Sequence, residues 1–266
     1  MHTGPIGIFD SGIGGLTVTR AIYEALPRES TIYFGDTARV PYGPKSPETV
    51  RRYSLEILGW LLDQGVKAVV IACNTSTAHA LDALRVASPV PVIGVIEPGA
   101  AAAVRASRGG TIGVIGTAGT VASGAYVRAI QARRPGAEVR QVACPLFVPL
   151  VEEGWFDHPA TELVAREYLA PLIAARVDVL VLGCTHYPLL KPLLARVMGP
   201  GVALIDSAEE TARETARVLE EKGLGAPAGH VAAHRFAVSD DEVRFREVGA
   251  RFIGERLASA EVVRLG

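Results

Sequence analysis

The segment AVVIACNTS, residues 68–76, decides the fold class of this 266-residue chain. Residues 68–72 are apolar at every position, which is typical of a strand buried on both faces of a parallel sheet. The polar residues Cys73-Asn74-Thr75-Ser76 follow at once, and a helical pattern continues to about Ala87. A buried strand that passes through a short polar segment into a helix predicts a doubly wound α/β sheet.

The same alternation of strands and helices surrounds this segment. Apolar runs predict strands over 6–9, 32–34 and 90–96, and apolar residues at helical spacing predict helices over 16–26 and 48–64. In doubly wound sheets, ligands bind at the carboxyl ends of the strands. Asp10-Ser11, the Pro41-Tyr42-Gly43 loop and Cys73-Asn74-Thr75 all follow predicted strands, so we expect a binding site there.

The second half of the chain repeats the first. Residues 6–8 match 112–114, Val40-Pro41 matches Val148-Pro149, and 69–75 match 180–185, at offsets of 106, 108 and 111. The shared order and the slowly growing offset predict two related α/β halves, and the length suits about two domains. Residues 207–266 are predicted to add a helix, a strand, a second helix and a short final strand, which the residues alone do not assign to either half.

The composition excludes several classes of protein. The chain is 49% apolar and 21% charged with a net charge of -1, so it is expected to bury a sizeable core. No block of five basic residues indicates a nucleic-acid partner, and no apolar run reaches the roughly 18 residues of a membrane helix. The first residues lack the pattern of a secretion signal, which predicts a cytoplasmic protein.

The three cysteines, Cys73, Cys144 and Cys184, are too few and too scattered for a disulfide framework, and none forms a CxxC motif. Cys73 and Cys184 each follow a buried strand at equivalent positions of the repeat. The simplest alternative is that both are buried structural residues, as we expect of Cys144. Matched placement at two strand ends favours a chemical role instead.

Two thiols on opposite sides of a tetrahedral carbon can invert its stereochemistry, because one removes a proton from one face and the other delivers a proton to the opposite face. Thiols at helix N-termini can have lowered pKa values, because the backbone N–H groups there stabilise the thiolate. Three kinds of acid–base group accompany them: Asp10 in the half of Cys73, His186 two residues after Cys184, and the pair Glu152 and Glu153 in a predicted loop.

The segment DSGIGG, residues 10–15, opens the first predicted helix and is rich in glycine. It departs from the dinucleotide-binding pattern at Thr17, but its N–H groups suit a carboxylate. Neutral donors stand beside the thiols: Ser11, Asn74, Thr75 and Thr185. They suit a small dianionic acid. Neither Lys45 nor Lys191 has the context of a pyridoxal phosphate lysine, and no cluster has metal-ligand spacing, so no cofactor or metal is expected.

Two other hypotheses remain open at this point. A non-catalytic sensor for a small dicarboxylate would use the same cleft between the halves, but it gives the two thiols no role. A redox switch would join Cys73 and Cys184 in a disulfide, which requires their Cα atoms to lie within about 7 Å. Thiols that flank a substrate carbon should be farther apart.

Four motifs carry a resemblance to a known family: residues 8–15 (IFDSGIGG), 40–43 (VPYG), 72–76 (ACNTS) and 183–188 (GCTHYP). They resemble the glutamate racemases of the aspartate/glutamate racemase family, in the right order and over nearly the whole chain. Aspartate and hydantoin racemases share the two-thiol design but resemble these flanks less. The resemblance implies cofactor-independent interconversion of L- and D-glutamate, which supplies D-glutamate for peptidoglycan.

The resemblance also implies an architecture. Residues 1–97 and 207–266 would form a discontinuous first α/β domain and residues 98–206 the second, with the active site in the cleft between them. Family members are commonly homodimers, and some bind DNA gyrase, although nothing in this sequence indicates either property.

The resemblance further implies roles for individual residues. The position of Cys73 handles the proton of D-glutamate and that of Cys184 the proton of L-glutamate. Asp10, Glu152 and His186 assist them, and Glu152 is preferred to Glu153 because the family pattern Pro-Leu-Val-Glu falls at 149–152. The substrate-holding positions are Asp10, Ser11, Tyr42, Gly43, Asn74, Thr75, Thr185 and His186.

Overall fold

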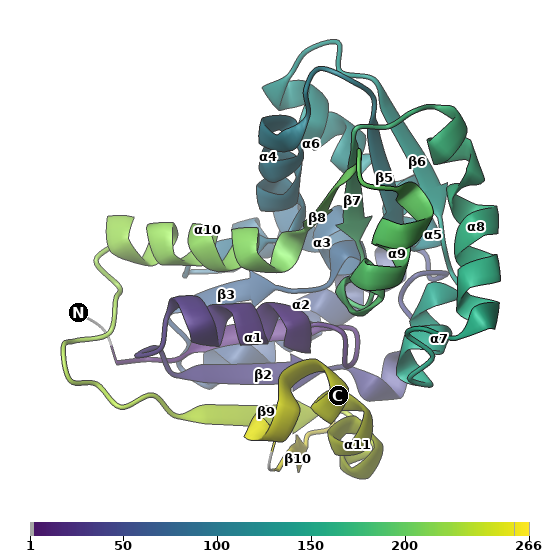
Figure 1. Ribbon diagram of the computed structural model, residues 1–266. Helices are drawn as coiled ribbons and strands as arrows, with labels where there is room; N and C mark the ends of the chain where they lie inside the picture. Colours follow the sequence, from purple (N-terminus) through teal and green to yellow (C-terminus); the bar gives the residue numbers. More distant parts are fainter. Residues whose placement is uncertain (1–2, 258, 266) are drawn as a thin grey trace.

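A computed structural model describes residues 3–257 and 259–265, so the ends of the predicted first domain, residues 1–2 and 266, lie outside the described residues. The described chain contains two parallel sheets, and helices cover both (Figure 1). The first sheet has the strand order β10-β9-β2-β1-β3-β4 and the second has the order β6-β5-β7-β8. This arrangement confirms the prediction of two doubly wound α/β halves.

The first half contains strands and helices from both ends of the chain. Its strands are β1 (Ile6–Asp10), β2 (Thr31–Gly35), β3 (Ala68–Ile71), β4 (Val92–Gly94), β9 (His234–Val238) and β10 (Glu261–Val262). Its helices are α1 (Leu16–Ala25), α2 (Pro47–Asp63), α3 (Asn74–Ala87), α10 (Ser207–Glu221) and α11 (Glu242–Ile253), with short 3₁₀ turns η1 (Thr37–Arg39) and η3 (Gly254–Arg256).

The second half is continuous in sequence. Its strands are β5 (Ile112–Gly116), β6 (Val139–Ala143), β7 (Val179–Gly183) and β8 (Ala203–Asp206). Its helices are α4 (Ile96–Ala106), α5 (Ala118–Ala122), α6 (Ala125–Arg133), α7 (Phe147–Glu152), α8 (Pro159–Ala174) and α9 (Lys191–Met198), and a 3₁₀ turn, η2 (Tyr187–Leu190), precedes α9.

The internal repeat predicted from the sequence is a repeat of topology and of register. Strands β2-β1-β3-β4 occur in the same order as β6-β5-β7-β8. Ile6 of β1 pairs with Ala68 of β3, and in the second half Ile112 of β5 pairs with Val179 of β7. The carboxyl ends of β3 and β7 therefore occupy equivalent places in the two sheets.

Helices cover both faces of the first sheet, which explains the unbroken apolar strands. Ile8 and Val70 belong to one core cluster with residues of α1 and α11, whereas Val69 and Ile71 pack with residues of α2 and α3. Successive side chains of a strand point to opposite faces, so every position of these strands is buried.

The segment after residue 206 joins the first sheet, because β9 pairs in parallel with β2 and β10 pairs with β9. Helix α10 contacts α1 in the first half and α4 in the second, and in Figure 1 it runs along the boundary between them. Whether each half, with boundaries at 97/98 and 206/207, is an independent folding unit stays a prediction. None of the helices in the described part of the chain is both long and apolar enough to cross a membrane.

Two details of the sequence-based prediction are wrong. The predicted strand at 90–96 ends at Gly94, and Ile96 already begins α4, where Pro98 lies in the first turn. Val148-Pro149 lies in α7, although the matching Val40-Pro41 precedes a loop. Proline is tolerated in the first turn of a helix because the N–H groups there have no intrahelical partner.

Candidate active site

Cys73 is the residue that caps the N-terminus of α3, directly after β3, and its exposed fraction is only 5%. The backbone N–H of Ser76 donates to its Sγ at 3.4 Å, and the thiol donates to Ser11 Oγ at 3.7 Å. The strand-to-helix junction therefore places Cys73 beside Ser11, the residue that follows β1.

The pKa of Cys73 is raised to about 11, mainly by burial and further by the charge of Asp10. The hydrogen bonds from Ser76 and with Ser11 lower it only in part. At this helix N-terminus, desolvation and a neighbouring carboxylate therefore outweigh the backbone donors in setting the pKa of Cys73.

Asp10 ends β1 and is almost fully buried, with an exposed fraction of 1%. Its Oδ2 accepts a hydrogen bond from the Gly12 N–H at 2.9 Å. Burial raises the pKa of Asp10, and the charge of His186 together with backbone N–H groups offsets part of that rise. The charge of His186, in the second half, therefore acts on the pKa of Asp10, in the first half.

Cys184 follows β7 and is buried as deeply as Cys73, with an exposed fraction of 6%. Its Sγ lies 3.9 Å from His186 Nδ1, and His186 Nε2 lies 3.1 Å from Glu152 Oε1. The chain does not enter an α-helix here, because η2 at 187–190 separates Cys184 from α9. Cys184, unlike Cys73, therefore does not stand at the N-terminus of an α-helix.

Cys184, His186 and Glu152 form a chain of contacts from a thiol through an imidazole to a carboxylate, and the pKa of the histidine is strongly shifted. Burial alone would lower the pKa of His186, but the hydrogen bonds to Cys184 and Glu152, together with their charges, raise it to about 10. For Glu152, burial acts to raise the pKa, but the hydrogen bond and charge of His186 and the charge of Arg244 outweigh it and lower the pKa. We therefore expect a cationic imidazole and an anionic carboxylate at neutral pH.

Glu152 is the last residue of α7, and Glu153 is the exposed residue that caps the same helix end. Both were predicted to lie in a loop. This is wrong for Glu152, because Pro149 is tolerated in the first turn of α7, but Glu153 does lie in the turn that follows the helix. The helix turns the Glu152 side chain toward His186, and its carboxylate remains about a quarter exposed.

Polar contacts join the two halves on both sides of the thiols. Thr17 Oγ1 donates to the carbonyl of Thr185 at 3.1 Å on the Cys184 side. On the Cys73 side, the hydroxyls of Thr75 and Thr117 lie 2.9 Å apart. The Gly119 N–H also donates to the Gly43 carbonyl at 2.9 Å. The substrate-holding positions predicted in the two halves therefore meet at one interface.

Sequence reasoning missed two of these interface residues. Thr117 follows β5 as Ser11 follows β1, at the repeat offset of 106, so the repeat contained a signal that could have identified it. Tyr126 is fully buried and its hydroxyl donates to Asn74 Oδ1 at 2.8 Å. It stands inside α6 with no motif around it, and only the packing of α6 against this interface reveals it.

The glycines of residues 10–15 allow a close approach between the halves. A Cβ at Gly14 would lie 2.2 Å from Thr185 Oγ1 and 2.5 Å from His186 Nδ1. A Cβ at Gly15 would lie 2.6 Å from the Cβ of Asp10. These distances are too short for any side chain, so the glycine-rich stretch is explained by contact with Thr185 and His186 without a phosphate.

Two buried polar atoms beside Cys73 lack a partner. Within residues 3–257 and 259–265, neither Asp10 Oδ1 nor Asn74 Nδ2 has a hydrogen-bond partner. Buried polar groups are almost always paired, so an unpaired acceptor and an unpaired donor call for a partner from outside the chain. A bound molecule with both donor and acceptor groups would satisfy them.

The remaining predicted residues have clear surroundings. Tyr42 is buried and its hydroxyl donates to Asp36, so burial and the Asp36 charge raise its pKa. Cys144 is fully buried and its thiol donates to the Val142 carbonyl at 3.7 Å, as befits a structural residue. All three cysteines are free, so Cys73 and Cys184 are not joined in this structure.

Comparison with known proteins identifies the family. Residues 6–215 match the Asp/Glu/Hydantoin racemase family. The chain is 55% identical to the glutamate racemase of Geobacter metallireducens over 260 residues, which are 98% of this chain and 96% of that protein. Two solved structures are each 39% identical and cover 100% of this chain.

The first of these structures is glutamate racemase isoform RacE1 from Bacillus anthracis, with a TM-score of 0.94 and 98% of that chain covered. The second is the glutamate racemase of Francisella tularensis in complex with D-glutamate, with a TM-score of 0.93 and 99% covered. The chain therefore belongs to the Asp/Glu/Hydantoin racemase family, as one of its glutamate racemases, which are isomerases.

Proposed function

We propose that this protein interconverts L- and D-glutamate without a cofactor, by a two-base mechanism in which Cys73 and Cys184 act on opposite faces of the α-carbon. The observation that carries the proposal is the pair of thiols, equally buried at equivalent strand ends and each with an acid–base partner. The substrate is inferred from the names of the full-length relatives.

The proton transfers balance in both directions of the reaction. From L-glutamate, the Cys184 thiolate takes the α-proton, and the resulting carbanion takes a proton from the Cys73 thiol on the other face. Cys184 then carries a thiol and Cys73 a thiolate, which is the state that the reverse reaction requires. The assignment of Cys184 to the L-enantiomer follows the family resemblance.

The partners of the two thiols support different steps. An imidazolium at His186, held by Glu152, stabilises negative charge that develops beside Cys184. Asp10 lies in the surroundings of Cys73 and is inferred to assist its proton transfer. The two carboxylates of glutamate are inferred to accept hydrogen bonds from Asn74 Nδ2 and from the hydroxyls of Ser11, Thr75 and Thr185. The loop at Tyr42 and Gly43 is inferred to help hold the substrate.

The test is a panel of L-amino acids in deuterated water, with the full chain and no added cofactor. The proposal expects deuterium at the α-carbon of glutamate and loss of circular dichroism, both much faster than for aspartate or alanine. Binding of glutamate with neither exchange nor inversion would contradict the proposal and favour the dicarboxylate sensor. A disulfide between Cys73 and Cys184 in the active preparation, found by peptide mapping, would favour the redox switch.

Three further expectations accompany the proposed function. They are a homodimer, a cytoplasmic location, and a role in supplying D-glutamate for peptidoglycan. Light scattering during gel filtration tests the first and fractionation of the source cells tests the second. The third expects that depletion of the protein arrests growth unless D-glutamate is supplied.

A further inference from the structure

Helix α11 is fixed to the first half by its apolar face. The ring of Phe245 stacks on Tyr33 of β2 with centroids 5.9 Å apart. Arg20 of α1 donates to the Phe252 carbonyl at 3.2 Å. A Cβ at Gly249 would lie 2.9 Å from Leu16, which shows how closely α11 approaches α1. The position of α11 is therefore set by the first half.

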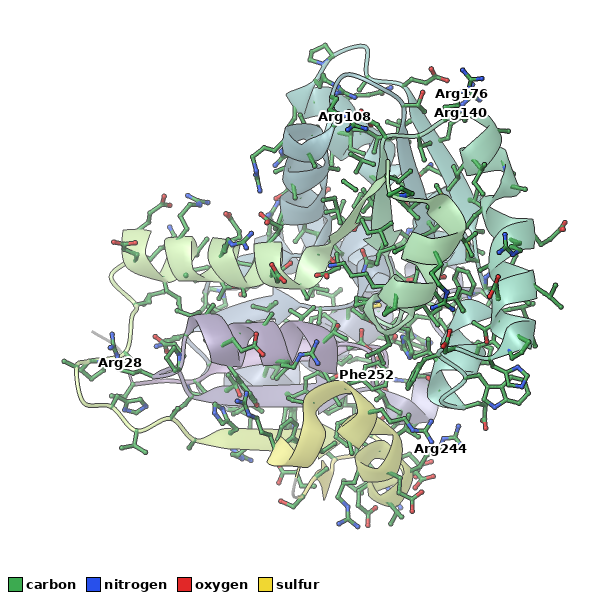
Figure 2. The ribbon with its side chains drawn as sticks, in the orientation of Figure 1. Arg28, Arg108, Arg140, Arg176, Arg244 and Phe252 are labelled. Carbon is green, nitrogen blue, oxygen red and sulfur yellow. The ribbon has the colours of Figure 1, made fainter. Side chains whose placement is uncertain are left out.

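Three residues of α11 contact the acid–base pair of the second half. The Phe252 ring meets the His186 ring edge to face, with centroids 5.5 Å apart and planes at 86°. Arg251 donates a hydrogen bond to the backbone carbonyl of Glu152. Arg244 Nη2 lies 3.9 Å from Glu152 Oε2, and Figure 2 shows this side chain extending from α11 toward the end of α7.

The end of α7 is shaped to receive the Arg251 guanidinium. Gly154 follows this end with a φ of +77°, in the left-handed region that favours glycine. A Cβ there would lie 3.1 Å from Arg251 Nη1. Arg251 therefore packs against a backbone that has no side chain at the point of contact, and it fixes the residue that carries the Glu152 carboxylate.

From these contacts we infer that Arg251, Arg244 and Phe252 are positioning residues, which hold Glu152 and His186 in contact across the boundary between the halves. The inference rests on the proposed function, because it gives the pair a role beside Cys184. Both members of the pair belong to the second half, whereas all three positioning residues belong to the first. The proton partner of Cys184 is therefore fully ordered only when the two halves meet as they do here.

Arg244 and Arg251 could also act only through their charge, and the sign of one pKa change separates the two explanations. A nearby cation disfavours the imidazolium, so removing an arginine that acts through charge alone raises the pKa of His186. If the arginine positions Glu152, its removal loosens the Glu152–His186 contact that raises the pKa of His186, and that pKa falls.

The experiment uses the full chain with the substitutions Arg251→Met, Arg251→Lys and Arg244→Gln, and with Arg246→Met as the control from an exposed position of α11. NMR titration of the histidine rings measures the pKa of His186, which we expect to be about 10 in the parent. We expect Arg251→Met to lower it by about one pH unit or more and to reduce kcat about tenfold, with little change in KM. Arg251→Lys keeps a donor and should restore most of both, and Arg246→Met should leave both unchanged.

An unchanged or raised pKa of His186 in Arg251→Met would overturn the inference. Should that variant lose its cooperative thermal transition, Arg244→Gln decides, because the Arg244 side chain is 56% exposed and its loss does not threaten folding. In Arg244→Gln, a fall in the pKa of His186 that is smaller than the one expected for Arg251→Met supports the inference, and a rise overturns it. The titration needs no turnover, so its result is independent of whether the parent racemises glutamate.

Discussion

Cys73 and Cys184 occupy the same place in two matching sheets and are almost equally buried, yet their surroundings differ. Cys73 caps an α-helix and has a serine hydroxyl, a backbone N–H and a neighbouring carboxylate. Cys184 stands before an irregular turn and contacts a histidine that is paired with a glutamate. The repeat places the two thiols at equivalent positions. The residues that surround each thiol and act on its pKa are not equivalent.

The difference originates in the segment after each strand. α3 begins directly after Cys73, so the first residues after that thiol are committed to helix capping and backbone hydrogen bonds. After Cys184 the helix is delayed until Lys191, which frees His186 to lie between the thiol and Glu152. A device that acts on both faces of one carbon needs two thiols in equivalent places but not two identical environments.

The largest effect is expected from removing either thiol. Cys73→Ser and Cys184→Ser should each reduce racemisation by about 10³-fold or more, because each thiol is the base in one direction and the acid in the other. Circular dichroism with pure L- and D-glutamate measures both directions. Cys144→Ser is the buried-cysteine control and should retain activity within a few-fold. Near-normal turnover in either single mutant would refute the two-base assignment.

The asymmetry between the thiols is tested by the partners of Cys184. His186→Asn and Glu152→Gln should each reduce kcat by about 10²-fold, since either change removes the ion pair beside that thiol. Glu153→Gln, at the exposed neighbouring position, should stay within about twofold. Equal losses in Glu152→Gln and Glu153→Gln would show that the geometry of α7 is unimportant for turnover.

The raised pKa of Cys73 predicts slow alkylation of the substrate-free protein. With a pKa of about 11 in the folded chain against the ordinary 9.0, its iodoacetamide reaction should rise about tenfold per pH unit between pH 8 and 10. In the chain unfolded by urea, the reaction rate of Cys73 should level off near pH 9. Peptide mass spectrometry follows Cys73 and Cys184 in one sample. A folded Cys73 rate that levels off near pH 9 or below, as in urea, would contradict the effect of burial and Asp10.

The smallest effects should come from the hydroxyls that join the halves. Thr75→Val on the Cys73 side removes the contacts of this hydroxyl with Thr117 and Thr120. Thr17→Val on the Cys184 side removes the hydrogen bonds of this hydroxyl to the carbonyls of Gly14 and Thr185, and both changes keep the shape of the residue. A net hydrogen bond contributes about 1 kcal/mol, so the loss of one or two bonds should change kcat/KM by about fivefold to about thirtyfold. Since the two enantiomers are equally stable, kcat/KM must change equally in both directions, and an unequal change would indicate a faulty assay.

The predictions from sequence succeeded where the pattern is local. The apolar run 68–72 is buried on both faces as expected, and the repeat at offsets of 106 and 111 corresponds to paired strands of equal register. They failed where a residue's neighbours come from elsewhere. Glu152 was expected in a loop, although Pro149 is compatible with the first turn of a helix, and that helix aims the carboxylate at His186.

The site was predictable only in part for the same reason. Cys73, Asp10 and His186 follow strands of predictable position, so their presence at the carboxyl edges of the sheets follows from the alternation of strands and helices. Tyr126, Arg251 and Phe252 lie inside helices without motifs, and no periodicity distinguishes a helical residue that faces the other half from one that faces water. Their contacts depend on how the halves pack.

The sequence by itself determined the α/β class, the twofold repeat and the two matched thiols. These features depend on local residue patterns, which indicate strand burial, helix periodicity and the order of the strands. Tertiary structure alone decided that burial and Asp10 raise the pKa of Cys73, and that Cys184 shares its surroundings with a His186–Glu152 pair held by α11. A pKa is set by desolvation and by charges within a few ångströms, and those neighbours are brought together only by the folded chain.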